Sequence, residues 1–172
     1  MIRDLARTIA EDKVLPVRAE LDEKEEFPSD IMKAIADADL FRVFVPADYD
    51  GLSGGVLDGC LIIEEISRVC GGVALSYAAT LLGTIPILLF GTDEQKKTYL
   101  PRIAGGAVAA FALTEESAGS DASNMTTTAV LDGDEYILNG AKQWITNGGV
   151  ADVYTVIAMT DKNKGSRGAS AF

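Results

Sequence analysis

The 172-residue sequence contains no histidine, only two cysteines and a single tryptophan. Without imidazole, these residues alone form neither a Ser-His-Asp nor a Cys-His hydrolase centre. Cys60 and Cys70 form no CxxC pair, which argues against a zinc site, and no metal site is expected. Ten residues along a helix span about 15 Å, beyond disulfide reach. We therefore expect two reduced thiols, as in a cytoplasmic or similar compartment.

Basic side chains are also scarce. The chain has 15 of them against 26 acidic ones, a net charge of -11. This charge repels nucleic acids, and no basic face is evident, so no nucleic-acid partner is expected. A polyanionic ligand would need helix N-termini or a local Lys/Arg pair to offset the same repulsion. The 48% apolar residues are ample for a globular core.

The N-terminus carries early acidic residues and has no apolar signal region, so no secretory signal is expected. One uncharged run, from Gly71 to Gly91, is about long enough to span a bilayer. Glycines and Pro86 dilute its hydropathy, and no Lys/Arg cluster flanks it closely. A buried core helix is therefore favoured over the alternative of a membrane helix, and no stable membrane insertion is expected.

Helices are predicted for the first hundred residues, where apolar positions recur at helical spacing. They are expected from Ile2 to Val17, from Pro28 to Ala38, from Leu57 to Cys70, from Gly71 to Gly91, and from Thr92 to Pro101. Thr92 and Gln95 form a capping-box pattern, and the last helix is expected to stop near Pro101. The segment Phe41 to Pro46 is short and β-prone.

Short β-prone runs follow Gly105-Gly106, separated by turn-forming residues. The runs are 108–113, 126–131, 136–138, 143–146 and 152–159, and the turns are 132–134, 139–140 and 147–149. Asn139-Gly140 and Asn147-Gly148 are expected to form hairpin turns that set the strand register. Helices followed by strands predict an α+β fold, with an all-α domain over residues 1–105 and an antiparallel β domain over 106–172. The final residues have the character of a strand interior, so the β domain is expected to be incomplete.

Two segments carry the chemistry. They are Phe111 to Asp121 (FALTEESAGSD) and Leu138 to Gly148 (LNGAKQWITNG). Both resemble signatures of the acyl-CoA dehydrogenase family, and the resemblance extends over the whole chain. It implies an FAD-dependent oxidoreductase of fatty-acid β-oxidation that desaturates acyl-CoA thioesters, with hydride transfer to flavin N5. It also implies electron-transfer flavoprotein as acceptor, a homotetramer, and a bacterial cytoplasmic or mitochondrial-matrix location.

A flavin presents carbonyl oxygens and N3–H along its pyrimidine edge, which backbone groups and one hydroxyl can satisfy. Trp144 can lie against one face of the ring while the Thr146 hydroxyl approaches N5, and alternation along a strand would put both on one side. The resemblance implies a set of cofactor-binding residues, of which Ser120 also lies by the acyl-CoA. The set is Phe111, Leu113, Thr114, Ser120, Trp144, Ile145 and Thr146. Without the family match, Trp144 would be an ordinary core residue and the first motif a plain strand end.

The sequence departs from the family at Glu116, where a proline is usual. The loop loses a fixed φ angle and gains a charge, so an effect on flavin affinity is expected. The basic loop from Lys162 to Arg167 is interpreted as a solvated tip, with the nucleotide end of coenzyme A as the alternative.

In the resembling family, the catalytic glutamate and much of the adenine contact come from a C-terminal helical domain, which is absent from Met1 to Phe172. No catalytic residue is therefore assigned, and the chain alone is expected to be inactive unless a complementary chain supplies the remainder. A non-catalytic binding module of the same fold and an acyl-CoA oxidase are the alternatives. The stretch from Ala151 to Gly168 resembles short-chain, butyryl-CoA-type members.

Overall fold

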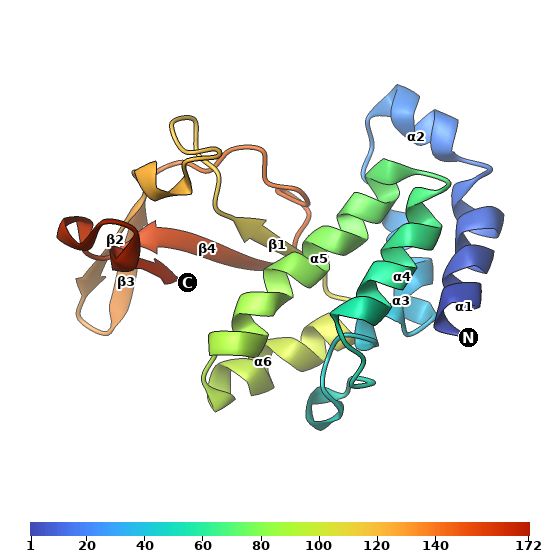
Figure 1. Ribbon diagram of the computed structural model, residues 1–172, viewed down its shortest axis with the longest axis horizontal. Coiled ribbons are helices and arrows are strands. Elements are labelled where there is room, and N and C mark those ends of the chain that lie inside the picture. Colours follow the sequence, from blue (N-terminus) through green and yellow to red (C-terminus); the bar gives the residue numbers. More distant parts are fainter.

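The computed structural model describes every residue from Met1 to Phe172 and has a helical part and a sheet part joined through helix α5 (Figure 1). The helical part contains α1 (Ile2–Ile9), α2 (Arg18–Lys24), α3 (Ser29–Asp37), α4 (Val56–Ser67), α5 (Gly71–Phe90) and α6 (Asp93–Ala104). A π-helix, Ala10–Val14, continues α1, and 3-10 turns lie at Leu40–Arg42, Ala47–Tyr49, Ala122–Asn124 and Lys162–Gly168. The predicted helices are present, although the first is followed by a separate α2.

The strands are β1 (Ala109–Ala112), β2 (Thr128–Asp132), β3 (Glu135–Asn139), β4 (Val153–Met159) and β5 (Ala169–Ala171). Their order is β1-β4-β2-β3, and β5 pairs with β4. The α+β class is confirmed, but the β domain is not purely antiparallel. β4 runs parallel to β1, with Ala109 opposite Val153, and parallel to β2 at Thr128 and Met159. Long connections make these parallel pairings possible, whereas the short link between β2 and β3 requires an antiparallel hairpin.

Some local predictions differ from the structure. The β-prone run from Phe41 to Pro46 lies in a 3-10 turn and the chain after it, where its apolar side chains are buried beside Tyr77 rather than paired in a sheet. Helix α6 continues through Pro101 to Ala104, because Leu100 and Ile103 are fully buried on its inner face. Asn139-Gly140 makes no hairpin turn but leads from β3 into a long loop.

Helix α5 is the central element of the core. It packs against α4, α6 and β1. The ring centroid of its Tyr77 lies 5.5 Å from that of Phe41 and 6.0 Å from that of Phe44. Gly83 allows a close approach to the sheet, since a Cβ there would lie 2.9 Å from the Ala110 carbonyl oxygen. By length and composition α5 is apolar enough to cross a membrane, and half of its most apolar window is buried inside the chain.

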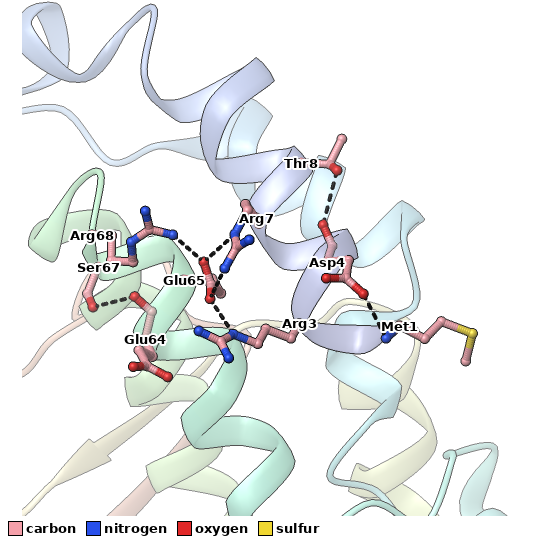
Figure 2. Close-up of polar contacts among 9 residues, drawn as sticks. All are labelled: Met1, Arg3, Asp4, Arg7, Thr8, Glu64, Glu65, Ser67 and Arg68. Atoms are coloured by element: carbon pink, nitrogen blue, oxygen red, sulfur yellow. Dashed lines mark hydrogen bonds and ion pairs between the residues drawn. The ribbon is translucent and has the colours of Figure 1, made fainter.

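Helix α1 is attached to α4 through Glu65, whose side chain is fully buried (Figure 2). Arg3, Arg7 and Arg68 surround this carboxylate at 2.6, 2.9 and 2.7 Å. Hydrogen bonds from Arg7 and Arg3 hold the pKa of Glu65 well below its usual range. A buried carboxylate needs such partners, so this cluster fixes the N-terminal helix to the core.

Candidate functional site

Six of the seven predicted cofactor-binding residues line one cavity of about 340 Å³ between α5 and the sheet part. They are Phe111, Leu113, Thr114, Trp144, Ile145 and Thr146. The opposite wall consists of four apolar residues of α5, namely Leu75, Ala78, Ala79 and Leu82. No ionisable side chain lines the cavity. The lining is therefore apolar apart from two threonines, which suits a largely uncharged group.

The two sequence motifs meet at this cavity through direct hydrogen bonds. The backbone N–H of Gln143 donates to the Thr114 carbonyl oxygen at 2.8 Å. The Lys142 ammonium donates to the Leu113 carbonyl oxygen at 2.9 Å. The end of β1 and the loop that follows β3 thus lie side by side, although about thirty residues separate them in the sequence.

Glu115 also links the end of β1 to the loop that follows β3. Its side chain is 3% exposed and pairs with Lys142, itself 10% exposed, at 2.8 Å. It also accepts hydrogen bonds from the Thr126 backbone N–H and hydroxyl, both at 2.6 Å, and from the Thr127 N–H at 3.0 Å. Burial alone would raise the pKa of Glu115, but hydrogen bonds from Lys142, Thr126 and Thr127 outweigh it and hold the pKa well below the usual range. Glu115 is therefore a structural anion, fully engaged with its own donors.

The prediction of a strand over residues 143–146 is wrong. These residues form a loop and turn, and Trp144 has a φ of +58°, in the left-handed region. Strand alternation therefore does not explain why Trp144 and Thr146 share the cavity; the turn itself brings both to it. The indole of Trp144 is 82% exposed, which is unusual for a large aromatic side chain. Such a conformation at a bulky residue is characteristic of functional sites.

Asn147 has a larger role than the hairpin turn expected for it. Its side chain is buried, with 7% exposed, and its φ is +66°. The Nδ2 group donates to the Ser76 carbonyl oxygen of α5 and to the Ala109 carbonyl oxygen of β1, both at 2.9 Å. Little in the sequence indicates this buried role. Asparagine tolerates the left-handed region, but it does so equally well in exposed turns.

Ser120 is the one predicted residue outside the cavity; it is exposed on the loop between β1 and β2. Glu116, which replaces the proline usual in the resembling family, is exposed in the same loop. Reciprocal backbone hydrogen bonds between Glu115 and Ala118, at 3.1 and 3.2 Å, close the turn around it. These backbone hydrogen bonds thus restrict the conformation of the loop at Glu116, as the ring of a proline would in part. The basic loop from Lys162 to Arg167 does not line the cavity.

Two family models match the chain. The acyl-CoA dehydrogenase N-terminal domain covers residues 1–107, and the acyl-CoA dehydrogenase middle domain covers residues 110–172. The chain therefore belongs to the acyl-CoA dehydrogenase family.

Similar proteins cover the whole of this chain but extend well beyond it. A probable acyl-CoA dehydrogenase of Mycobacterium tuberculosis is 44% identical over 99% of this chain and 44% of the relative. The structure of butyryl-CoA dehydrogenase from Megasphaera elsdenii matches with a TM-score of 0.93 and 38% identity, over 99% of this chain and 46% of that one. Acyl-CoA dehydrogenase from Bacillus anthracis, solved in complex with FAD, matches with a TM-score of 0.89 and 40% identity, over 100% of this chain and 30% of that one. The chain thus spans less than half the length of these relatives.

Proposed function

We propose that residues 1–172 form one side of the flavin and substrate site of an FAD-dependent acyl-CoA dehydrogenase. The reaction is α,β-dehydrogenation of an acyl-CoA thioester, with a short acyl chain as in the butyryl-CoA dehydrogenase that the fold resembles. The observation that carries the proposal is the convergence of both family motifs on one apolar cavity. Family membership supports electron-transfer flavoprotein as the acceptor, a homotetrameric enzyme, and a bacterial cytoplasmic or mitochondrial-matrix location.

The chemistry of the cavity lining suits an isoalloxazine ring. The α5 side chains form an apolar wall, and the hydroxyls of Thr114 and Thr146 face the same space. The backbone N–H groups of Thr114, Trp144 and Thr146 donate to no backbone acceptor in the chain. A ring edge with carbonyl oxygens and ring nitrogens would satisfy these donors. FAD bound here would supply the two-electron acceptor for the β-hydrogen.

The protein's own part in this reaction is to place the ring and exclude water. The exposed Trp144 indole would cover one face of the ring, and the Thr146 hydroxyl would donate near N5. Leu75 and Leu82 would border the acyl chain and keep the site dry. Ser120, outside the cavity on an exposed loop, keeps its proposed place beside the acyl-CoA and the pyrophosphate.

The base that removes the α-proton is proposed to lie outside residues 1–172. No carboxylate lines the cavity, and Glu115 is already bound to Lys142, Thr126 and Thr127. We therefore expect the isolated chain to bind FAD weakly and to catalyse no turnover. Stoichiometric flavin in the isolated polypeptide, bleached by butyryl-CoA, would contradict this part of the proposal.

The test uses the whole enzyme that contains these residues. We expect one FAD per chain, anaerobic bleaching by butyryl-CoA, and reoxidation by electron-transfer flavoprotein. The double variant Thr114→Val/Thr146→Val should weaken FAD binding at least tenfold, because two hydroxyl groups near the ring are lost. Thr98→Val, on the exposed face of α6, is the matched control and should bind FAD normally. A colourless protein would refute the proposal, and fast reoxidation by oxygen would identify an acyl-CoA oxidase instead.

A further inference from the structure

The loop from Trp144 to Thr146 has very little to hold it in place. Its three residues belong to no strand, and the hydrogen bond from Gly148 N–H to the Ile145 carbonyl oxygen, 2.8 Å long, is local. On the N-terminal side the nearest attachment consists of Gln143, bonded to Thr114, and Lys142, bonded to Leu113 and Glu115. On the C-terminal side the nearest tie is the Asn147 side chain. The position of the loop is therefore set by these two attachments.

Asn147 attaches the loop to both other walls of the cavity at once. Its acceptors are Ser76, between the cavity-lining residues Leu75 and Ala79 of α5, and Ala109, two residues before Phe111 in β1. Thr80 joins the same buried cluster, with its hydroxyl 3.4 Å from Nδ2 of Asn147. Each attached element thus carries cavity-lining residues within three positions of its hydrogen bond.

The two carbonyl groups beside Asn147 require a side chain that donates two hydrogen bonds. The carbonyl oxygens of Ser76 and Ala109 only accept hydrogen bonds, so the group that faces them must donate twice. The φ of +66° restricts the position to residues that tolerate the left-handed region. The Oδ1 atom of Asn147 is buried with no donor in the chain. A buried, half-satisfied amide is costly, so turn formation alone does not account for asparagine at this position.

We propose that Asn147 is the positioning residue that sets the gap between the Trp144–Thr146 loop and helix α5. This inference rests on the proposed function, since that gap would receive the flavin ring. Asn147 lines no part of the cavity and acts only through the loop, the helix and the strand that it joins.

Asn147→Asp in the whole enzyme is the sharpest test, because aspartate is isosteric and tolerates the same φ but does not donate when ionised. We expect at least a tenfold rise in the FAD dissociation constant at pH 8. We also expect partial recovery towards pH 5.5, since burial among carbonyl oxygens favours the protonated carboxyl, which can donate. Asn139→Asp, at an exposed position of β3, is the matched control and should show neither effect.

A second readout is independent of flavin. Trp144 is the only tryptophan of residues 1–172. Once every tryptophan outside this range is replaced by phenylalanine, the time-resolved fluorescence anisotropy of the flavin-free enzyme reports the mobility of the loop. Asn147→Asp should lower this anisotropy at pH 8, and Asn139→Asp should leave it unchanged. If the wild-type enzyme binds no FAD, the proposed function fails, while the anisotropy still tests the role of Asn147.

Asn147→Gly keeps the test decisive if the aspartate variant does not fold, because glycine accepts the same φ and introduces no charge. It should also weaken FAD binding at least tenfold, without pH dependence. Wild-type FAD affinity together with wild-type anisotropy in either folded variant would overturn the proposal.

Discussion

Lys142→Met should destabilise the protein, because it leaves the buried carboxylate of Glu115 without its counterion. The ammonium lies 2.8 Å from Glu115 and 2.9 Å from the Leu113 carbonyl oxygen. Methionine retains the apolar stem of the side chain but neither hydrogen bond. Because both members of the ion pair are almost fully buried, water is poorly placed to replace the lost cation.

The size of the effect follows from what remains around the carboxylate. Removing one partner of a buried ion pair costs about 3–5 kcal/mol when the other is left uncompensated. Glu115 keeps three hydrogen bonds from Thr126 and Thr127, so the cost should fall below this range, to about 2–3 kcal/mol. In a chain of this length that corresponds to a fall in Tm of about 5–10 °C.

The double variant Glu115→Gln/Lys142→Met separates charge from packing. A neutral amide needs no counterion, but its single oxygen cannot accept from both the Thr126 and the Thr127 N–H groups, so the double variant should regain part of the stability lost in Lys142→Met. Urea denaturation followed by far-ultraviolet circular dichroism measures both, and Lys97→Met, on the exposed side of α6, is the surface control. Wild-type stability in the single variant, or no recovery in the double variant, would refute the argument.

Three other predictions concern the scaffold. Glu65→Gln should lower the urea midpoint clearly more than Asp37→Asn, because Glu65 is buried among three arginines while Asp37 pairs with one exposed lysine; equal midpoints would contradict this. The folded-state pKa values of Glu65 and Glu115 are depressed, so their contribution is complete above about pH 5 and declines as the pH falls towards those values. A urea midpoint that does not change between pH 7 and pH 3 would count against it. Thr92→Ala removes the cap of α6 and should cost about 1 kcal/mol, measurable by calorimetry.

Local signals in the sequence were sufficient for most of the helices. The capping box of α6 forms as predicted, with Thr92 N–H bonded to the Gln95 side chain at 2.9 Å and Gln95 N–H to the Thr92 hydroxyl at 3.2 Å. The end of α6 was not predictable in this way, because tertiary burial of Leu100 and Ile103 outweighs the helix-breaking tendency of Pro101.

Strand predictions failed where β-prone residues serve another purpose. Phe41 and its neighbours are aromatic and β-branched because they fill the space around Tyr77, a contact that local propensity cannot reveal. Residues 143–146 have the composition of a strand, yet no neighbouring strand pairs with them. The mixed sheet likewise depends on how loops cross between β1, β2 and β4, which no local pattern records.

Six of the ten residues that line the cavity were predicted from the two motifs, but neither the four on α5 nor the way in which the loop is held was predicted. The motifs also contain Lys142, Glu115 and Asn147. Nothing in the spacing of the motifs shows that these three side chains form the hydrogen bonds on either side of the Trp144–Thr146 loop. The hydrogen bond from Asn147 to Ser76 joins residues 71 positions apart. A contact of that separation depends on the packing of α5 against β1, which is a property of the whole fold.

The Trp144–Thr146 loop has no strand partner, so hydrogen bonds from buried side chains hold it in place of the backbone hydrogen bonds of a sheet. Here one anchor precedes the loop, where Lys142 joins Leu113 to Glu115, and one follows it, where Asn147 joins α5 to β1. The three residues between them remain free to present an indole, a hydroxyl and unpaired backbone N–H groups to the cavity. Loss of either anchor should therefore change the position of the loop at the cavity.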